Sequence, residues 1–152
     1  MTGFGLLGHL LEIAKGSTLS AKVRWSDVPL LPDVLDFAAE GIVTGASGRN
    51  WGGYSDRIKL DASLNEAQKA VLTDPQTSGG LLVACAPETC DEVLRIFREE
   101  GFADAAVIGE CVAGAAEGGR LAGEGMDSQQ RHQGRPSQQP LYRTHDEQSG
   151  VG

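Results

Sequence analysis

The chain has 152 residues, the size of one ordinary domain, which excludes a large multidomain enzyme. Its 13 Lys and Arg against 21 Asp and Glu give a net charge of -8, so bulk charge attracts neither nucleic acid nor anionic lipid. Hydrophobic residues make up 40% of the sequence, enough to bury a core, and the 21 glycines predict many tight backbone positions.

The N-terminal segment carries leucines at helical spacing. This pattern predicts an amphipathic helix over about residues 3–15, with Gly16 as its C-terminal stop. The segment is short, contains His9 and Glu12, and has no basic region before it. We therefore expect neither a signal peptide nor a membrane span, and a cytoplasmic location.

The next segment combines one strand, one helix and one glycine-rich stretch. Residues 19–25 alternate with period two and predict a strand. Pro and Asp then begin a helix over 33–39, with Gly41 as its stop. Four glycines within 45–53 predict a loop.

Strand and helix patterns alternate through the rest of the ordered part. Residues 65–72 predict a short helix with an asparagine cap, closed by an Asp-Pro pair. Strands are predicted at 81–86 and 105–112, with the edge of a last strand near 119–122 and a helix over 87–100 between them. This alternation predicts a layered α/β or α+β domain.

The composition changes near residue 123. Residues 124–152 hold six glutamines, two prolines and four apolar residues with no helical or strand period. We therefore divide the chain into a domain over 1–123 and a disordered tail over 124–152. A partner-binding peptide around Leu141 and Tyr142 is the ordered alternative for the tail.

Three cysteines and one histidine limit the chemistry of the ordered part. Cys85, Cys90 and Cys111 have no C-x-x-C spacing, so we expect free, buried or half-buried thiols rather than a disulfide framework or a zinc site. His9 has no second histidine to pair with in residues 1–123. A helix-surface histidine bonded to a neighbour is its expected state.

Residues 3–8 match G-x-G-x-x-G, and Asp27 follows at the distance of a ribose-binding acid. A dinucleotide fingerprint needs a strand leading into its first glycine, and no sequence for such a strand precedes it here. We therefore favour a structural interpretation, in which these glycines let the start of a helix pack closely against another backbone.

Two further segments are candidates for binding. Residues 73–80, T-D-P-Q-T-S-G-G, present small polar residues that suit either an anion-binding nest or a tight turn in which Asp74 caps local backbone. The segment lacks the lysine and following helix of a P-loop. Near residue 50, two interpretations are open for Arg49, Trp51 and Tyr54. They could anchor a protein interface or the edge of a ligand site, or the two aromatic residues could cover the core of the domain.

Three strings in order resemble the C-terminal half of selenophosphate synthetase (selenide, water dikinase), within the wider AIR-synthase-like group of ATP-using enzymes. They are T-G-F-G-L-L-G-H-L at 2–10, G-x-x-x-R-N at 45–50 and T-D-P-Q-T-S-G-G-L-L at 73–82. The resemblance covers about 1–123 and implies an α/β (α+β) domain of the AIR-synthase C-terminal type, a mixed sheet packed with helices.

The resemblance also implies an activity and a division of labour. The family makes selenophosphate, AMP and phosphate from selenide, ATP and water with Mg²⁺. Its reactive cysteine or selenocysteine, a lysine and most ATP and metal contacts belong to an N-terminal ATP-binding domain, which also forms the homodimer, and a metal-binding aspartate would precede Met1. We therefore expect this chain to need that domain as partner, to hold no catalytic residue, metal or bound cofactor, and to be inactive alone.

By motif, the resemblance places a set of residues along or behind the cleft: Thr2, Gly3, Gly5, His9, Arg49, Asn50, Asp74, Gln76, Thr77, Ser78, Gly79 and Gly80. A rival interpretation is a non-catalytic docking or structural domain, whose loops only contact the other half. A related enzyme acting on a purine or thiamine precursor is a third, disfavoured by the complete D-P-Q-T-S-G-G string.

Overall fold

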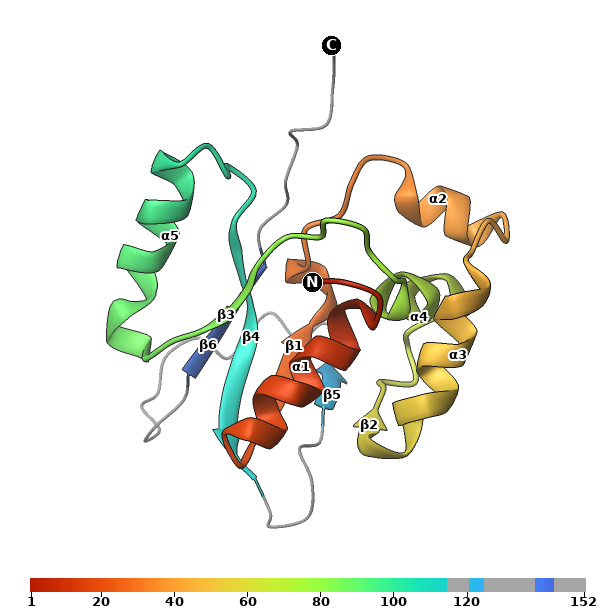
Figure 1. Cartoon of the computed structure of the whole chain (residues 1–152), viewed down its shortest axis with the longest axis horizontal. Coiled ribbons are helices and arrows are strands. Elements are labelled where there is room, and N and C mark those ends of the chain that lie inside the picture. Colours follow the sequence, from red (N-terminus) through yellow and green to blue (C-terminus); the bar gives the residue numbers. More distant parts are fainter. Residues whose placement is uncertain (115–120, 125–138, 144–152) are drawn as a thin grey trace.

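The computed structural model describes residues 1–114, 121–124 and 139–143. Within these residues, strands form one mixed sheet and helices pack around it (Figure 1). This arrangement confirms the predicted α/β class. In chain order the strands are β1 Leu19–Arg24, β2 Ile58–Lys59, β3 Leu82–Ala84, β4 Ala106–Ala113, β5 Leu121–Glu124 and β6 Gln139–Arg143.

The sheet of the described residues has the order β2-β5-β1-β4-β6-β3. Strand β1 pairs in parallel with β5 and antiparallel with β4, where Leu19 lies opposite Ala113 and Val23 opposite Gly109. Strand β6 pairs antiparallel with both β4 and β3. The first and last thirds of the domain are therefore interleaved in one sheet.

The helices divide into groups around this sheet. In Figure 1, α1 lies in front of β1 and β4, α2, α3 and α4 gather on one side, and α5 stands at the opposite side near β3. Their bounds are α1 Gly5–Gly16, α2 Val34–Ala39, α3 Gly45–Tyr54, α4 Glu66–Thr73 and α5 Cys90–Glu99. None of the helices in the described part is long and apolar enough to cross a membrane.

Helix α1 provides much of the core, as its leucine spacing predicted. Leu6, Leu10 and Ala14 are completely buried, and they join Ile108 of β4 in one hydrophobic cluster. Burying each leucine contributes about 1.5–3 kcal/mol relative to leaving it exposed. The position of α1 against the sheet is therefore fixed by its apolar face.

Helix α4 begins and ends where the sequence predicted. The Asn65 side chain accepts from Gln68 N at 2.9 Å, and the Gln68 side chain accepts from Asn65 N at 2.8 Å, which completes a capping box. The helix ends at Thr73, and the next residue, Asp74, has the extended backbone preferred before Pro75. The 74–80 loop then leads to β3.

The predicted loop at 45–53 is wrong, because helix α3 occupies it. Thr44 caps the helix by accepting from Ser47 N at 3.2 Å. The Ser47 hydroxyl donates to Ala70 O of α4 at 2.8 Å, and Tyr54 is buried. A helix-interior glycine costs about 1 kcal/mol relative to alanine, and these contacts with α4 and the core outweigh that cost.

Part of the predicted disordered tail is a strand. Residues 139–143 form β6, in which Leu141 lies opposite Ala84 and Tyr142 opposite Val83. Strands β3 and β4 do not pair with each other, and β6 lies between them and supplies the ladder hydrogen bonds of both. The local sequence of 139–143 does not reveal this pairing, because its partners are distant in the chain. Most of 124–152 lies outside the described residues, and for that part disorder stays a prediction.

A close contact between two backbone segments lies at the start of α1. Gly5 has a φ of +68°, and a Cβ there would stand 2.7 Å from Thr73 C and 2.8 Å from Thr73 O. Both the positive φ and the contact require glycine. Gly5 confirms the interpretation that a glycine here lets a helix start approach another backbone, whereas Gly8 faces the side chains of Phe4 and Tyr54 and nothing lies within 4 Å of a Cβ at Gly3.

We expect Gly5→Ala to lower the free energy of unfolding by at least about 2 kcal/mol, because the methyl group meets rigid backbone and the φ is strained. Gly3→Ala is the matched control, since nothing lies within 4 Å of a Cβ at Gly3. Urea denaturation of both variants measures the difference. Equal stability of the two variants would contradict the contact.

Candidate functional site

Two motifs far apart in sequence meet at the candidate site. Residues 1–4, which we call the N-terminal turn, lie against the 74–80 loop: Gln76 N donates to Thr2 O at 3.1 Å. The N-terminal ammonium donates to Gly79 O at 3.2 Å and to Gly80 O at 2.7 Å. The sequence motifs at 2–10 and 73–82 therefore form one face.

Helix α3 fixes the N-terminal turn from the other side. The Asn50 amide donates to Gly3 O at 2.8 Å and to Thr73 O at 3.0 Å, so one side chain ties the turn to the end of α4. The Tyr54 hydroxyl donates to Phe4 O at 3.1 Å. Burial raises the pKa of Tyr54 to about 12, which keeps the hydroxyl protonated as a donor.

His9 holds the turn from within α1. Its Nε2 lies 2.9 Å from Thr2 N and 3.0 Å from Thr2 Oγ1. Accepting from the Thr2 N–H requires an unprotonated Nε2. Burial, and after it the nearby N-terminal ammonium, lower the pKa of His9 and favour that neutral form. The prediction of a surface histidine bonded to a neighbour is confirmed.

The 74–80 loop is most exposed at its centre. Thr77 and Ser78 are exposed, and Ser78 has a φ of +54°. Asp74 accepts from the Thr44 hydroxyl at 3.2 Å, while burial raises the pKa of its carboxyl. Thr44 therefore joins the loop to the start of α3, rather than Asp74 capping local backbone.

A groove of about 940 Å³ runs beside this loop. We call it the apolar groove. It is lined by α2 and the segment that follows it, by Ala70 and Val71 of α4, and by residues 74–80. Sequence analysis missed its apolar lining, Phe37, Ile42 and Val43, because short runs of apolar residues beside a helix end do not distinguish a core from a groove.

Some predicted site residues do not join this face. Arg49 is exposed on α3. Its guanidinium lies along its own helix, where Nη1 would be 3.5 Å from a Cβ built on Gly45. Tyr54 packs into the core, and Trp51 is half-buried against it with Lys69 Nζ 5.5 Å from its ring centre. Of the two interpretations for these aromatic residues, covering the core is the one that the structure supports.

The three thiols lie apart from these contacts. Cys85 follows β3, Cys90 begins α5, and Cys111 is buried in β4, and all three are free as predicted. Burial raises the pKa of the Cys111 thiol. A thiol in that state is a poor nucleophile.

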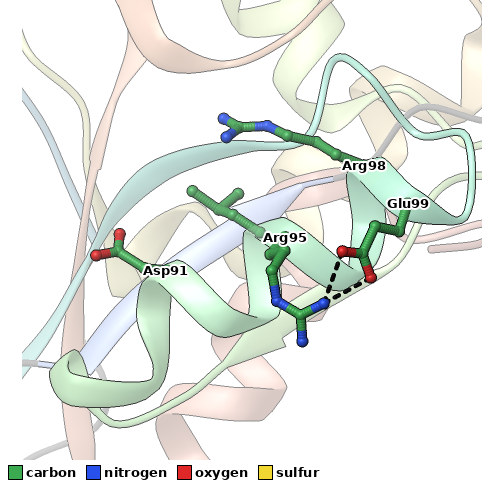
Figure 2. A pocket seen from close by; sticks show the side chains of 5 residues that line it. Asp91, Arg95, Arg98 and Glu99 are labelled. Carbon is green, nitrogen blue, oxygen red and sulfur yellow. Dashed lines mark hydrogen bonds and ion pairs between the residues drawn. The ribbon is translucent and has the colours of Figure 1, made fainter.

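A second hollow lies on the exposed face of α5 (Figure 2). Figure 2 shows Arg95 turned toward Glu99, where Nη1 donates to both carboxylate oxygens at 2.7 Å and 2.6 Å. Asp91 and Arg98 also line it, and no predicted site residue does. An ion pair one helical turn apart on a solvated face is ordinary helix surface, so we place no function there.

Comparison with known proteins decides the family. A family model described as AIR synthase related protein, C-terminal domain, matches residues 1–121. The chain belongs to this family.

Individual relatives agree with the three motifs. A selenide, water dikinase from Paraburkholderia xenovorans (strain LB400) is 61% identical over 114 residues, which cover 75% of this chain and 32% of the relative. Proteins of the same name from Pseudomonas straminea and Rhizobium meliloti (strain 1021) are 56% and 47% identical over 115 and 117 residues, covering 76% and 77% of this chain and 32% and 34% of the relatives. The expected resemblance to selenophosphate synthetase is confirmed.

These matches lie in the C-terminal region of the relatives. The chain spans about a third of the length of the relatives that it matches. The AIR-synthase-type domain described here therefore corresponds to one part of a larger protein in those organisms.

The described residues of this family domain do not fit a magnesium site by themselves. Mg²⁺ is held by one or two carboxylates together with substrate phosphates. Asp74 on the site face is bonded to Thr44 and has a raised pKa, and among the described residues no three metal-ligating side chains come together. We derive no step through a metal ion from these residues.

We expect Asn50→Ala to lower the free energy of unfolding by about 1–3 kcal/mol, because it leaves the carbonyls of Gly3 and Thr73 without their donor. Asn50→Asp should cost more, since it places a carboxylate against both carbonyls. Arg49→Ala, an exposed change on the same helix, is the control. Thermal or urea unfolding measures all three, and equal losses for Arg49 and Asn50 would contradict the role of Asn50.

The state of His9 predicts a pH dependence. Because the pKa of His9 in the folded chain lies below its ordinary 6.5, the unfolded chain binds more protons between these two pKa values, and the contribution of neutral His9 to stability, fully present above 6.5, is lost as pH falls below 6.5 and through the lower pKa of the folded chain. His9→Gln should flatten the fall in unfolding free energy between about pH 7.5 and about pH 5. Identical slopes for the two proteins would show that His9 does not respond as described.

Proposed function

We propose that this chain acts as the C-terminal domain of a selenide, water dikinase, the type of enzyme that converts ATP, selenide and water to selenophosphate, AMP and phosphate. The observation that carries the proposal is the meeting of the N-terminal turn with the 74–80 loop, because two of the three family motifs then share one face. The names of the relatives give the reaction class.

The chemistry of this face suits positioning rather than catalysis. The Asn50 amide nitrogen, the Tyr54 hydroxyl and His9 Nε2 bond to the N-terminal turn, and the Thr44 hydroxyl donates to Asp74. Toward solvent the face presents Phe4 of the N-terminal turn and the small residues Thr77 and Ser78 of the 74–80 loop, and small residues permit close approach by a second surface. In this proposal the domain shapes one wall of a cleft.

The remaining parts of the proposed enzyme lie outside this domain. ATP, Mg²⁺ and the reactive residues are held by the N-terminal ATP-binding half, which also forms the homodimer, and the protein works in the cytoplasm. The isolated chain is then inactive. A pure docking or structural domain is the second candidate, favoured by the same observation that the polar side chains of the face bond within the domain.

A chimera tests the proposal. Residues 1–121 of this chain replace the matched region of the Paraburkholderia xenovorans relative, and AMP formation from ATP is measured with and without selenide. We expect selenide-dependent AMP from the chimera and none from the isolated chain. No selenide-dependent AMP from a folded chimera, or AMP from the chain alone, would contradict the proposed function.

A pair of glycine variants separates a cleft wall from a passive domain. A Cβ at Gly79 would collide with the Gln76 amide oxygen and stand 2.9 Å from Met1 O, whereas nothing lies within 4 Å of one at Gly52. In the chimera, Gly79→Val should lower the rate by roughly tenfold and Gly52→Val should change it little, since only the first disturbs the loop. Equal rates would favour the docking or structural role.

A further inference from the structure

The apolar groove carries an unusual concentration of exposed apolar side chains. Phe37 is 51% exposed, Ile42 64% and Val43 51%, and Leu31 beside them is 49% exposed. All four line the groove. Isolated exposed apolar residues are normal on a protein surface, but a contiguous set in a concave site marks a place where another surface binds.

The border of the groove is polar and nearly uncharged. Asp74 is the single charged residue among the described residues that line it, and Thr44 donates to its carboxylate. Thr77 and Ser78 contribute hydroxyl groups on the loop side. An apolar centre with few charges and a polar rim is the composition of a protein–protein interface core.

The position of the N-terminus identifies the occupant. The N-terminal ammonium is bonded to Gly79 O and Gly80 O, and both glycines line the groove. In the relatives, the matched region is C-terminal and amounts to about a third of the length. Met1 itself lines a neighbouring hollow, so the polypeptide that precedes it there begins beside the 74–80 loop, which forms one wall of the groove.

We propose that the apolar groove is the docking site for the polypeptide that precedes this domain in its relatives. The partner presents apolar side chains to Phe37, Ile42 and Val43, and it places no acidic side chain against Asp74, because two carboxylates in a partly buried site repel each other. The choice of partner rests on the proposed function. The groove is then the surface on which the two halves meet, and Phe37, Ile42 and Val43 hold them together.

A second copy of this chain fits the groove less well. A symmetric dimer uses the same patch on both subunits, so the patch must complement itself. A concave groove of about 940 Å³ needs a protruding partner, and two grooves facing each other leave a void. The shape therefore favours a different polypeptide over self-association.

Binding in trans tests the inference. The part of the Paraburkholderia xenovorans relative that precedes its matched region is purified and titrated with this chain by calorimetry, and the Kd is measured. Ile42→Asp in the groove should weaken binding by roughly tenfold or more, because it places a charge in the apolar centre. Val43→Asp, a second groove variant, should act in the same direction.

The matched control is Ile96→Asp. Ile96 is also an exposed isoleucine, at 46%, but it lies on α5, on the opposite side of the molecule from α2 (Figure 1). Its substitution should leave the Kd within about twofold. Equal weakening by groove and control variants, or no binding by the unmodified chain, would overturn the docking site. A concentration-dependent dimer that Ile42→Asp dissociates would also overturn it, in favour of self-association.

The outcome is separable from that of the proposed function. A chimera that makes selenide-dependent AMP at an unchanged rate when Ile42 is aspartate, together with an unchanged Kd in trans, would remove the groove inference and leave the function standing. Binding that the groove variants weaken, together with a chimera that makes no selenide-dependent AMP, would remove the proposed function and leave the docking site standing. In both cases thermal unfolding of the variants confirms that the exposed substitutions leave the domain folded.

Discussion

The close contact between the start of α1 and the end of α4 is the constraint on which the rest of the site depends. Gly5 lies directly against the backbone of Thr73 and Asp74, where no side chain fits. This contact brings the N-terminal turn beside the loop that leaves α4, so that Gln76 can donate to Thr2 O. With any other residue at Gly5, the helix would have to move away and the shared face would open.

Helix α3 supplies hydrogen-bond donors to the backbone at this contact. The carbonyls of Gly3, Phe4 and Thr73 accept hydrogen bonds from it, and Thr73 is buried, where a carbonyl is costly without a partner. Asn50 and Tyr54 supply the donors from one helix face. The hydrogen bonds of these few large and polar side chains therefore stabilise the glycine-rich sequence as a helix.

The 74–80 loop belongs both to the site face and to the apolar groove. In the proposed assembly, a polypeptide docked in the groove would press on the same loop that lines the cleft. Docking in the groove and positioning of the loop would then be coupled. Thr44 donates to Asp74 on the groove side, and Gln76, two residues further along the loop, donates to Thr2 O of the N-terminal turn. In this proposal, a domain with few reactive groups would act on the reaction through the position of that loop.

The sequence by itself determined the elements that local signals define. The leucine spacing of α1, the alternation of β1 and the asparagine cap of α4 are short-range patterns, and the three motif strings were enough to identify the family. Tertiary structure alone decided that 45–54 is helical, that 139–143 joins the sheet, and that Phe37, Ile42 and Val43 line a groove. The physical reason is range: propensities are summed over neighbours in the chain, whereas the contacts of Ser47 with α4 and of β6 with β3 and β4 join residues distant in sequence.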